Sequence, residues 1–183
     1  MRELHAAVHA GTEAGRILMV EHDPVYTAGR ATPPEELRPG IVPIERGGRI
    51  TFHGPGQLVV YPIVRLPRRD VRDWLRRLEA LGVGVAAALG AEATPSVDGT
   101  GVFVGRRKFA SIGVAVKHWI NLHGISINVA MDSAPWFEVR PCGLSPDVMT
   151  DLATILGRPV TLDEAKDAAR AAVSVLTTAR DPL

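Results

Sequence analysis

The sequence contains a single cysteine, Cys142, among its 183 residues. One cysteine excludes an intramolecular disulfide and cannot by itself supply a thiolate metal site. Cys142 is therefore either a small packing residue or a nucleophile. Pro141 fixes φ before it, and Gly143 after it permits backbone angles that other residues resist. These neighbours predict a sharp loop that presents the thiol at a fixed angle, but they do not choose between the two interpretations.

An excess of charge of one sign is also missing, because the formal net charge is +1. A general nucleic-acid binder needs many cationic contacts to phosphates, so that class is excluded. The most apolar stretch, residues 82–91, is too short to span a bilayer. The first nine residues carry Glu3 and two histidines where a signal peptide needs an apolar run. We therefore expect a cytoplasmic protein that binds neither membrane nor nucleic acid.

Internal repeats, low-complexity tracts and linker-like shifts of composition are absent from the sequence. A chain of 183 residues with 46% hydrophobic and 22% charged residues is ordinary for a globular protein with a substantial core. We expect one domain over residues 1–183.

Short apolar runs bounded by glycine and polar residues predict strands, and capping patterns predict helices. Asp70 is a predicted N-cap, Ser145-Pro146 predicts a helix start, and Thr161 to Glu164 is a capping box. We expect strands over 16–21, 41–45, 58–64, 102–104, 108–117 and 120–129, and helices over 2–12, 70–89, 145–157 and from 161 onward. Helices on both sides of a run of strands predict an α/β or α+β fold, with a mixed sheet flanked by helices.

Six arginines crowd between residues 65 and 77, diluted only by Asp70, Asp73 and the nearby Glu79. Such a run is typical of a solvated helix face. It also suits docking of an acidic protein partner, because a positive patch speeds encounter with a negative surface. The sequence leaves both interpretations open.

Residues 46–57, Arg-Gly-Gly-Arg-Ile-Thr-Phe-His-Gly-Pro-Gly-Gln, form the most glycine-rich segment. The segment lacks the spacing of a P-loop and of the dinucleotide-binding fingerprint. Its glycines either let the backbone approach a ligand or simply shape hairpin turns. His53 within it is either an imidazole base or a hydrogen-bonded loop residue.

Lys108 begins a β-rich segment in which small residues recur at 111–113 and, on the next strand, at 123–126. Small side chains leave room for a ligand or merely allow close packing. A lysine at the start of a strand is usually a surface charge, but an ammonium beside a cysteine would favour the reactive thiolate. His53, His123 and Cys142 lack the spacing of metal ligands, so we expect no metal and no cofactor.

Taken together and in order, these segments resemble the octanoyl-[acyl-carrier-protein]:protein N-octanoyltransferase family, also called lipoyl(octanoyl) transferases. The resemblance rests on residues 21–30, 46–57, 100–104, 108–113, 123–128 and 141–144. It covers nearly the whole chain without a large gap. The glycine-rich segment alone is also similar to that of lipoate ligases, so the specific signal is its combination with Lys108 and Pro-Cys-Gly.

The resemblance implies the fold of the biotin/lipoate ligase catalytic domain and a reaction in which Cys142 carries the acyl group as a thioester beside Lys108. The donor would be octanoyl-acyl carrier protein. The acceptors would be lysines in lipoyl domains of 2-oxo acid dehydrogenase E2 subunits and of the glycine cleavage H protein, in the first step of endogenous protein lipoylation. The implied substrate pocket comprises Arg46, Gly47, Gly48, Arg49, Ile50, Thr51, Phe52, His53, Ser111, Ile112, Gly113, Gly124, Ile125 and Ser126.

Two alternatives remain at this point. An ATP-dependent lipoate or biotin protein ligase would activate its acid as an adenylate, which leaves Cys142 without a role. A non-catalytic acyl- or biotin-binding module would keep the glycine-rich pocket and make both Lys108 and Cys142 incidental.

Overall fold

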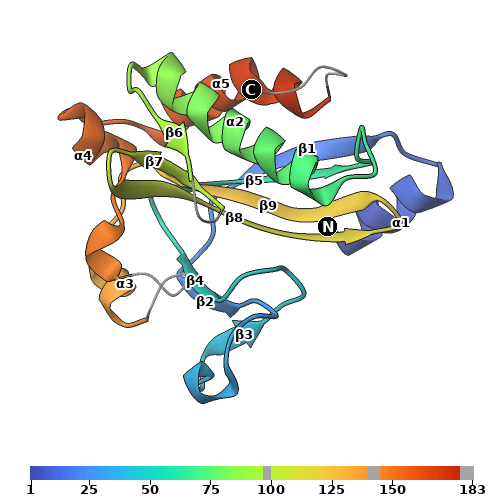
Figure 1. Cartoon of the computed structure of the whole chain (residues 1–183), viewed down its shortest axis with the longest axis horizontal. Coiled ribbons are helices and arrows are strands. Elements are labelled where there is room, and N and C mark those ends of the chain that lie inside the picture. The colour runs from blue at the N-terminus through green and yellow to red at the C-terminus, as the bar shows by residue number, and fades with distance from the viewer. Residues whose placement is uncertain (97–99, 140–144, 178–183) are drawn as a thin grey trace.

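The computed structural model describes residues 1–96, 100–139 and 145–177, which form two β-sheets and the helices around them (Figure 1). The larger sheet has the strand order β1-β5-β9-β8-β7-β6, and the smaller has the order β3-β2-β4. The strands of the larger sheet are β1 (Gly15–Val20), β5 (Gln57–Val64), β6 (Thr94–Pro95), β7 (Val102–Val104), β8 (Arg107–Lys117) and β9 (Ile120–Asn128). The strands of the smaller sheet are β2 (Val25–Ala28), β3 (Ile41–Pro43) and β4 (Ile50–His53).

Every neighbouring pair in the larger sheet is antiparallel. The parallel pairing lies in the smaller sheet, where β2 runs parallel to β3 and antiparallel to β4. Helices α2 (Val71–Leu89) and α5 (Leu162–Ala172) cover one face of the larger sheet, and the smaller sheet lies beyond its other face (Figure 1). The predicted mixed-sheet architecture flanked by helices is confirmed.

The remaining helices are short and lie around the edges. They are α1 (Arg2–Ala10), α3 (Ala134–Phe137), α4 (Leu152–Leu156) and 3-10 turns at Pro34–Glu36, Pro146–Val148 and Val173–Leu176. In the described part of the chain, no helix is long and apolar enough to cross a membrane.

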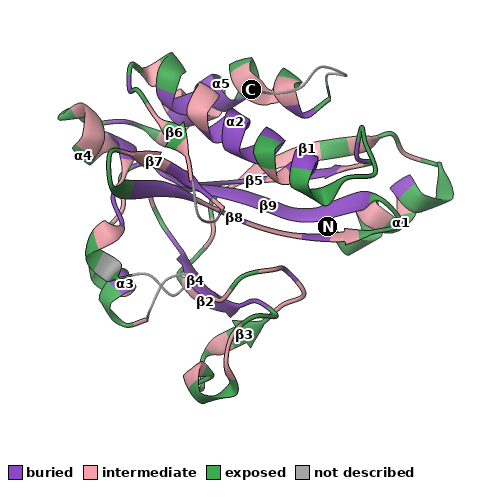
Figure 2. Cartoon of the chain, in the orientation of Figure 1, coloured by how far each residue is buried: buried purple, intermediate pink, exposed green. Residues whose placement is uncertain are grey.

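The main core lies between α2 and the larger sheet, where Trp74 and Leu81 pack in one cluster with Leu58 and Ile127. Strand β9 is buried along its whole length, as Figure 2 shows, because it lies in the middle of the sheet with both faces covered. Covering both faces of a sheet removes the alternation of apolar and polar residues that a half-exposed strand would show.

Local capping sets both ends of α2, and the N-cap is the one that the sequence predicts. The Asp70 side chain accepts hydrogen bonds from the backbone N–H groups of Arg72, at 2.8 Å, and Asp73, at 3.2 Å. Gly90 ends the helix with φ at 95°, a left-handed conformation that favours glycine. The predicted capping box between Thr161 and Glu164 is likewise present at the start of α5.

The predicted helix over 145–157 is wrong in its first half. Pro146–Val148 forms a 3-10 turn, and Met149 then lies alongside Lys108 in a parallel bridge. The backbone N–H of Thr150 donates to the Lys108 carbonyl at 2.9 Å, which draws this segment toward the sheet. Asp151 therefore becomes the N-cap of α4 through a 2.7 Å bond from the N–H of Thr154.

The arginine cluster divides in two. Arg77 is fully buried, and its Nε donates to Asp73 at 2.7 Å while Nη1 donates to the carbonyl of Val175 at 2.9 Å. The other arginines are exposed and are Arg65, Arg68, Arg69, Arg72 and Arg76. Most of the cluster is thus a solvated surface, whereas Arg77 joins α2 to the C-terminal segment.

The cap of α2 gives a test of local stability. Replacing Asp70 with Ala removes the acceptor of two backbone N–H groups, so the free energy of unfolding should fall by about 1 kcal/mol. Urea denaturation followed by circular dichroism measures it. Asp70→Asn keeps a capping oxygen and should retain most of the stability; an equal loss in both variants would contradict the capping role.

Candidate active site

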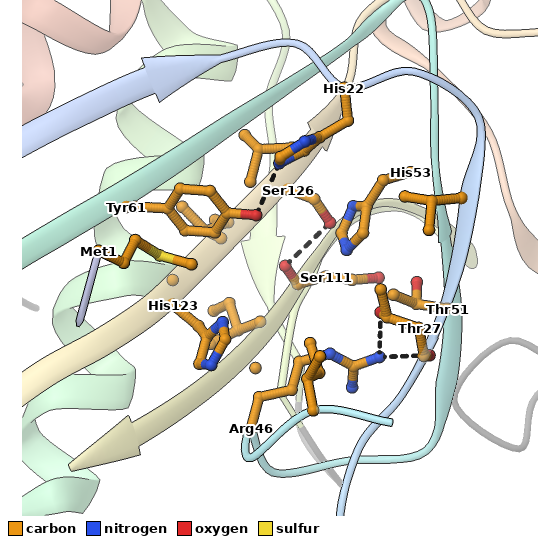
Figure 3. Close-up of a pocket in the computed structure, with 17 residues that line it drawn as sticks. Met1, His22, Thr27, Arg46, Thr51, His53, Tyr61, Ser111, His123 and Ser126 are labelled. Carbon is orange, nitrogen blue, oxygen red and sulfur yellow. Dashed lines mark hydrogen bonds between the residues drawn. The ribbon is translucent and has the colours of Figure 1, made fainter. Parts of the chain in front are cut away.

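A cavity of about 180 Å³ lies between the two sheets (Figure 3). Strands β8 and β9 form one wall, and the rest comes from residues on or next to β1, β2, β4 and β5, from the segment that follows β3, and from Met1. The lining residues are Met1, His22, Val25, Thr27, Ile44, Arg46, Thr51, His53, Val59, Tyr61, Ser111, Ile112, Gly113, His123, Gly124, Ile125 and Ser126. Most of this lining is apolar or small, with a few polar groups, as is typical of a pocket for an apolar ligand.

Small residues at the centre of β8 and β9 make space for this cavity. Ser111 pairs with Ser126, and Gly113 pairs with Gly124. A Cβ atom added at Gly124 would lie 2.1 Å from the carbonyl oxygen of Val60 on the neighbouring strand. The glycine is therefore required for the close approach of β5 to β9 at the floor of the site.

Arg46 closes the cavity on the side of the smaller sheet and is only 6% exposed. Its Nη1 donates to the carbonyls of Gly47, at 3.0 Å, and Arg49, at 2.8 Å. Its Nη2 donates to the carbonyl of Thr27 at 2.8 Å and to the hydroxyl of that residue at 2.9 Å. One guanidinium thus joins β2 to the glycine-rich segment. A Cβ atom added at Gly113 would lie 2.8 Å from the Cδ of Arg46, so the glycine leaves the space that the Arg46 side chain occupies.

Three imidazoles and one phenol line the cavity. The Nε2 atom of His22 lies 2.8 Å from the Tyr61 hydroxyl, and the rings of His22 and His53 are 5.8 Å apart (Figure 3). Burial, against the opposing effect of the hydrogen bond to Gln57 and together with the positive charge of Arg46, lowers the pKa of His53 from 6.5 to about 4. Burial also lowers the pKa of His123, against the opposing effect of the Glu45 carboxylate, and raises the pKa of Tyr61. At neutral pH His53 is therefore uncharged.

The structure brings only part of the predicted pocket to the cavity. The predicted residues that line it are Arg46, Thr51, His53, Ser111, Ile112, Gly113, Gly124, Ile125 and Ser126. Those that do not line it are Gly47, Gly48, Arg49, Ile50 and Phe52. Alternation along β4 explains two of these, because neighbouring residues of a strand point to opposite faces. Phe52 instead packs with Trp136 and Met149 in a second apolar cluster.

The cavity also includes residues that the sequence did not single out for the pocket. They are Met1, His22, Val25, Thr27, Ile44, Val59, Tyr61 and His123. A signal was available for several of them: alternation along the predicted strand 58–64 places Val59 and Tyr61 on one face. His22 follows β1. Thr27 belongs to β2, a strand that the sequence did not predict.

Lys108 is not a surface charge, since it is only 4% exposed. Its Nζ donates to the carbonyl of Thr100 at 3.0 Å and lies 5.7 Å from the centre of the Phe103 ring. Gly101 lies against it, because a Cβ there would come within 2.5 Å of the lysine Cε. On α2, Glu79 accepts a 3.3 Å bond from the Gly101 N–H, and burial raises the pKa of its carboxyl. Lys108 does not itself line the cavity.

Cys142 lies outside the described residues, so its distance from Lys108 stays a prediction. The described residues that follow it bear on the question. Met149 and Thr150 are paired with the backbone of Lys108, as described above, so the chain reaches this lysine shortly after the Pro-Cys-Gly segment.

The family model for the lipoyl protein ligase A/B catalytic domain matches residues 1–174. The chain belongs to this family. It is 46% identical over 169 residues to an octanoyltransferase from Geobacter metallireducens, covering 90% of this chain and 79% of that protein. It is 42% identical over 175 residues to an octanoyltransferase from Salinispora tropica, covering 90% and 82%. The chain is accordingly an acyltransferase of the octanoyltransferase type.

Solved structures of the family share the fold. Lipoate-protein ligase A bound with ATP has a TM-score of 0.77 at 17% identity, covering 93% of this chain and 77% of that one. The bi-partite lipoate protein ligase of Thermoplasma acidophilum has a TM-score of 0.72 at 19% identity, covering 93% and 75%. The likeness to lipoate ligase catalytic domains expected from the sequence is confirmed at the level of the fold.

The neutral state of His53 predicts a pH dependence of stability. Between pH 6.5 and about 4 the unfolded chain binds a proton on this imidazole that the folded chain does not. The free energy of unfolding should therefore fall as the pH falls through this range, by up to about 3 kcal/mol from His53 alone. Urea denaturation at several pH values measures it. His53→Gln should flatten the dependence, whereas His9→Gln, at an exposed position of α1, should not; equal behaviour of the two variants would contradict the assignment.

Proposed function

We propose that this octanoyltransferase moves the octanoyl group of octanoyl-acyl carrier protein first to Cys142 and then to a lysine of a lipoyl domain. The acceptors are lipoyl domains of 2-oxo acid dehydrogenase E2 subunits and the glycine cleavage H protein. The reaction takes place in the cytoplasm, within one domain that spans residues 1–183, and uses no metal or cofactor.

The observation that carries this proposal is the burial of Lys108. Among the described residues no carboxylate oxygen comes within salt-bridge distance of its Nζ, which donates a hydrogen bond to the Thr100 carbonyl. Burying an ammonium without a paired carboxylate is costly, and fully buried lysines are rare. A lysine kept in such a place is a candidate for proton transfer, and family resemblance pairs this one with Cys142.

The proposed reaction has two steps. The Cys142 thiolate attacks the donor thioester; a new C–S bond forms, the old one breaks, and the carrier-protein thiol leaves with a proton. This exchange of one thioester for another costs little free energy. The neutral amine of the acceptor lysine then attacks octanoyl-Cys142, forming the amide and releasing the thiolate. Lys108 supplies the proton in the first step and, once neutral, takes one from the amine in the second.

The cavity supports an acyl substrate. Its apolar lining includes Val25, Ile44 and Val59, from both sheets. Each buried methylene contributes about 0.8 kcal/mol, so an eight-carbon chain gains several kcal/mol on entering. Amide formation from a thioester is downhill, so ATP is unnecessary. This distinguishes the proposal from the ligase alternative, in which a free acid must first be activated.

A mass measurement tests the acyl-enzyme directly. Incubation with octanoyl-acyl carrier protein, without ATP and without acceptor, should add one octanoyl group to the intact protein, and peptide mapping should place it on Cys142. Cys142→Ser should lose transfer while its circular dichroism spectrum stays that of the wild type. Turnover that requires ATP and leaves no adduct would favour the ligase instead.

A second test moves Lys108 without replacing it. In Gly101→Ala the new methyl group would meet the lysine Cε, at 2.5 Å, and the Ala110 carbonyl oxygen, at 2.6 Å, at a φ of 142°. Displacing a reacting group by about 1 Å can lower the rate about 10²-fold, so we expect kcat/KM to fall by this order. Gly105→Ala is the matched control, with positive φ in the same hairpin and no atom within 4 Å of the added carbon. Equal losses in the two variants would remove the role given to Lys108.

A further inference from the structure

A one-way chain of hydrogen bonds begins at the backbone beside Lys108 and ends in the cavity. The carbonyl of Thr150 accepts from the Nδ2 of Asn128 at 2.9 Å. The Oδ1 of Asn128 then accepts from the Nε2 of Gln57 at 2.9 Å, and the Oε1 of Gln57 lies 2.7 Å from the Nδ1 of His53. The N–H of Thr150 bonds in turn to the Lys108 carbonyl.

This chain fixes the proton on the imidazole. A backbone carbonyl can only accept, so Asn128 must turn its NH₂ group toward Thr150 and its oxygen toward Gln57. Gln57 must then donate to Asn128 and present its own oxygen to His53. The Nδ1 atom of His53 therefore carries the hydrogen, and Nε2 is left as an acceptor.

The acceptor atom belongs to a ring that faces the cavity, as Figure 3 shows. Among the described residues the structure gives Nε2 no hydrogen-bond partner. The charged and titratable groups that face this ring are Arg46, His22 and His123, and none of them favours its protonation. An imidazole whose pKa is about 4 is a poor general base near neutral pH, but it is a good acceptor of a hydrogen bond.

The substrates differ in what they can offer to this acceptor. An octanoyl chain and its thioester have no N–H or O–H group to donate. The neutral amine of an acceptor lysine has N–H groups that can donate, and it also has the lone pair that attacks. A hydrogen bond from that amine to a fixed acceptor would turn the lone pair toward the acyl carbon.

We propose that His53 Nε2 accepts a hydrogen bond from the attacking amine of the acceptor lysine, and that Gln57 and Asn128 are positioning residues that hold His53 in this tautomer. The inference rests on the proposed function, because it presumes an acyl-enzyme that a lysine attacks. His53 takes no proton in this role; the proton that the amine loses goes to Lys108.

The tautomer can be tested without any substrate. In ¹⁵N NMR spectra, with His53 assigned by comparison with His53→Gln, the wild-type ring should show a protonated Nδ1 and a bare Nε2 between about pH 5 and 8. In Gln57→Glu the new carboxylate should stabilise the imidazolium and bring its titration into this range. A bare Nδ1 in the wild type, or a wild-type titration near pH 6.5, would overturn the proposal.

The role in catalysis is tested by separating the two steps. With His53→Leu, amide formation should slow about 10- to 100-fold more than acylation of Cys142 does, as expected for one lost hydrogen bond in a buried site. His53→Gln, whose amide oxygen can accept, should recover part of the second rate. In Gln57→Glu the rate of amide formation should fall as the pH falls, because a protonated His53 Nε2 can no longer accept a hydrogen bond from the amine.

Equal slowing of both steps in His53→Leu, or an unchanged second step, would overturn the role. A wild-type protein that forms no acyl adduct would instead contradict the proposed function, and the NMR result would still stand on its own. If the circular dichroism of His53→Leu differs from that of the wild type, the role is tested instead by the pH dependence of amide formation in Gln57→Glu.

Discussion

The close pairing of β8 with β9 is the constraint on which the rest of the site depends. Where these strands cross the centre of the larger sheet, they carry serine and glycine, so the sheet presents backbone rather than bulky side chains to the smaller sheet. Gly124 lets β5 approach from one side, and Gly113 makes room for Arg46 on the other. The cavity exists because side chains are missing at the place where two sheets would otherwise pack against each other.

The polar groups around this space are held before any substrate arrives. The guanidinium of Arg46 donates hydrogen bonds to backbone carbonyls of the glycine-rich segment and to the carbonyl and hydroxyl of Thr27 on β2, so it acts as a fixed support for the cavity wall. His53 is oriented from behind by Gln57, and His22 is joined to Tyr61. Dipoles that are already fixed need no reorganisation during a reaction, which is the usual source of electrostatic advantage in enzymes. The apolar lining and the oriented polar groups together suit an acyl chain with a reactive end.

The sequence predicted local features well because their causes are local. Asp70 and Thr161 bond to N–H groups two or three residues away, so the starts of α2 and α5 follow from a few neighbouring letters. The start of α4 could not be predicted this way. Met149 and Thr150 pair with Lys108, about forty residues earlier in the chain, and this pairing replaces the first turn of the expected helix.

The candidate site shows the same division. The family resemblance predicted which segments surround the cavity. Which residues of these segments face the cavity depends on strands that the sequence did not predict, such as β4. Phe52 points away from the cavity while Thr51 and His53 point into it, and this follows only once residues 50–53 are known to be extended. The burial of Lys108 is a further property of the fold alone, since it comes from the contact with Thr100 and Gly101.

The proton transfers of the proposed reaction limit which residue can act as the general base. The incoming lysine must lose a proton to a group able to hold it near neutral pH. Arg46 has no lone pair to offer, and His53 holds a proton only near pH 4. Glu79 accepts a hydrogen bond from the Gly101 N–H, and burial raises the pKa of the Glu79 carboxyl against the opposing effect of the positive charge of Lys108. Lys108 alternates between ammonium and amine in the proposed scheme. The hydrogen bonds that run from His53 through Gln57 and Asn128 reach the backbone of Lys108 through Thr150. Movement of that strand would therefore disturb the proton carrier and the hydrogen-bond acceptor together.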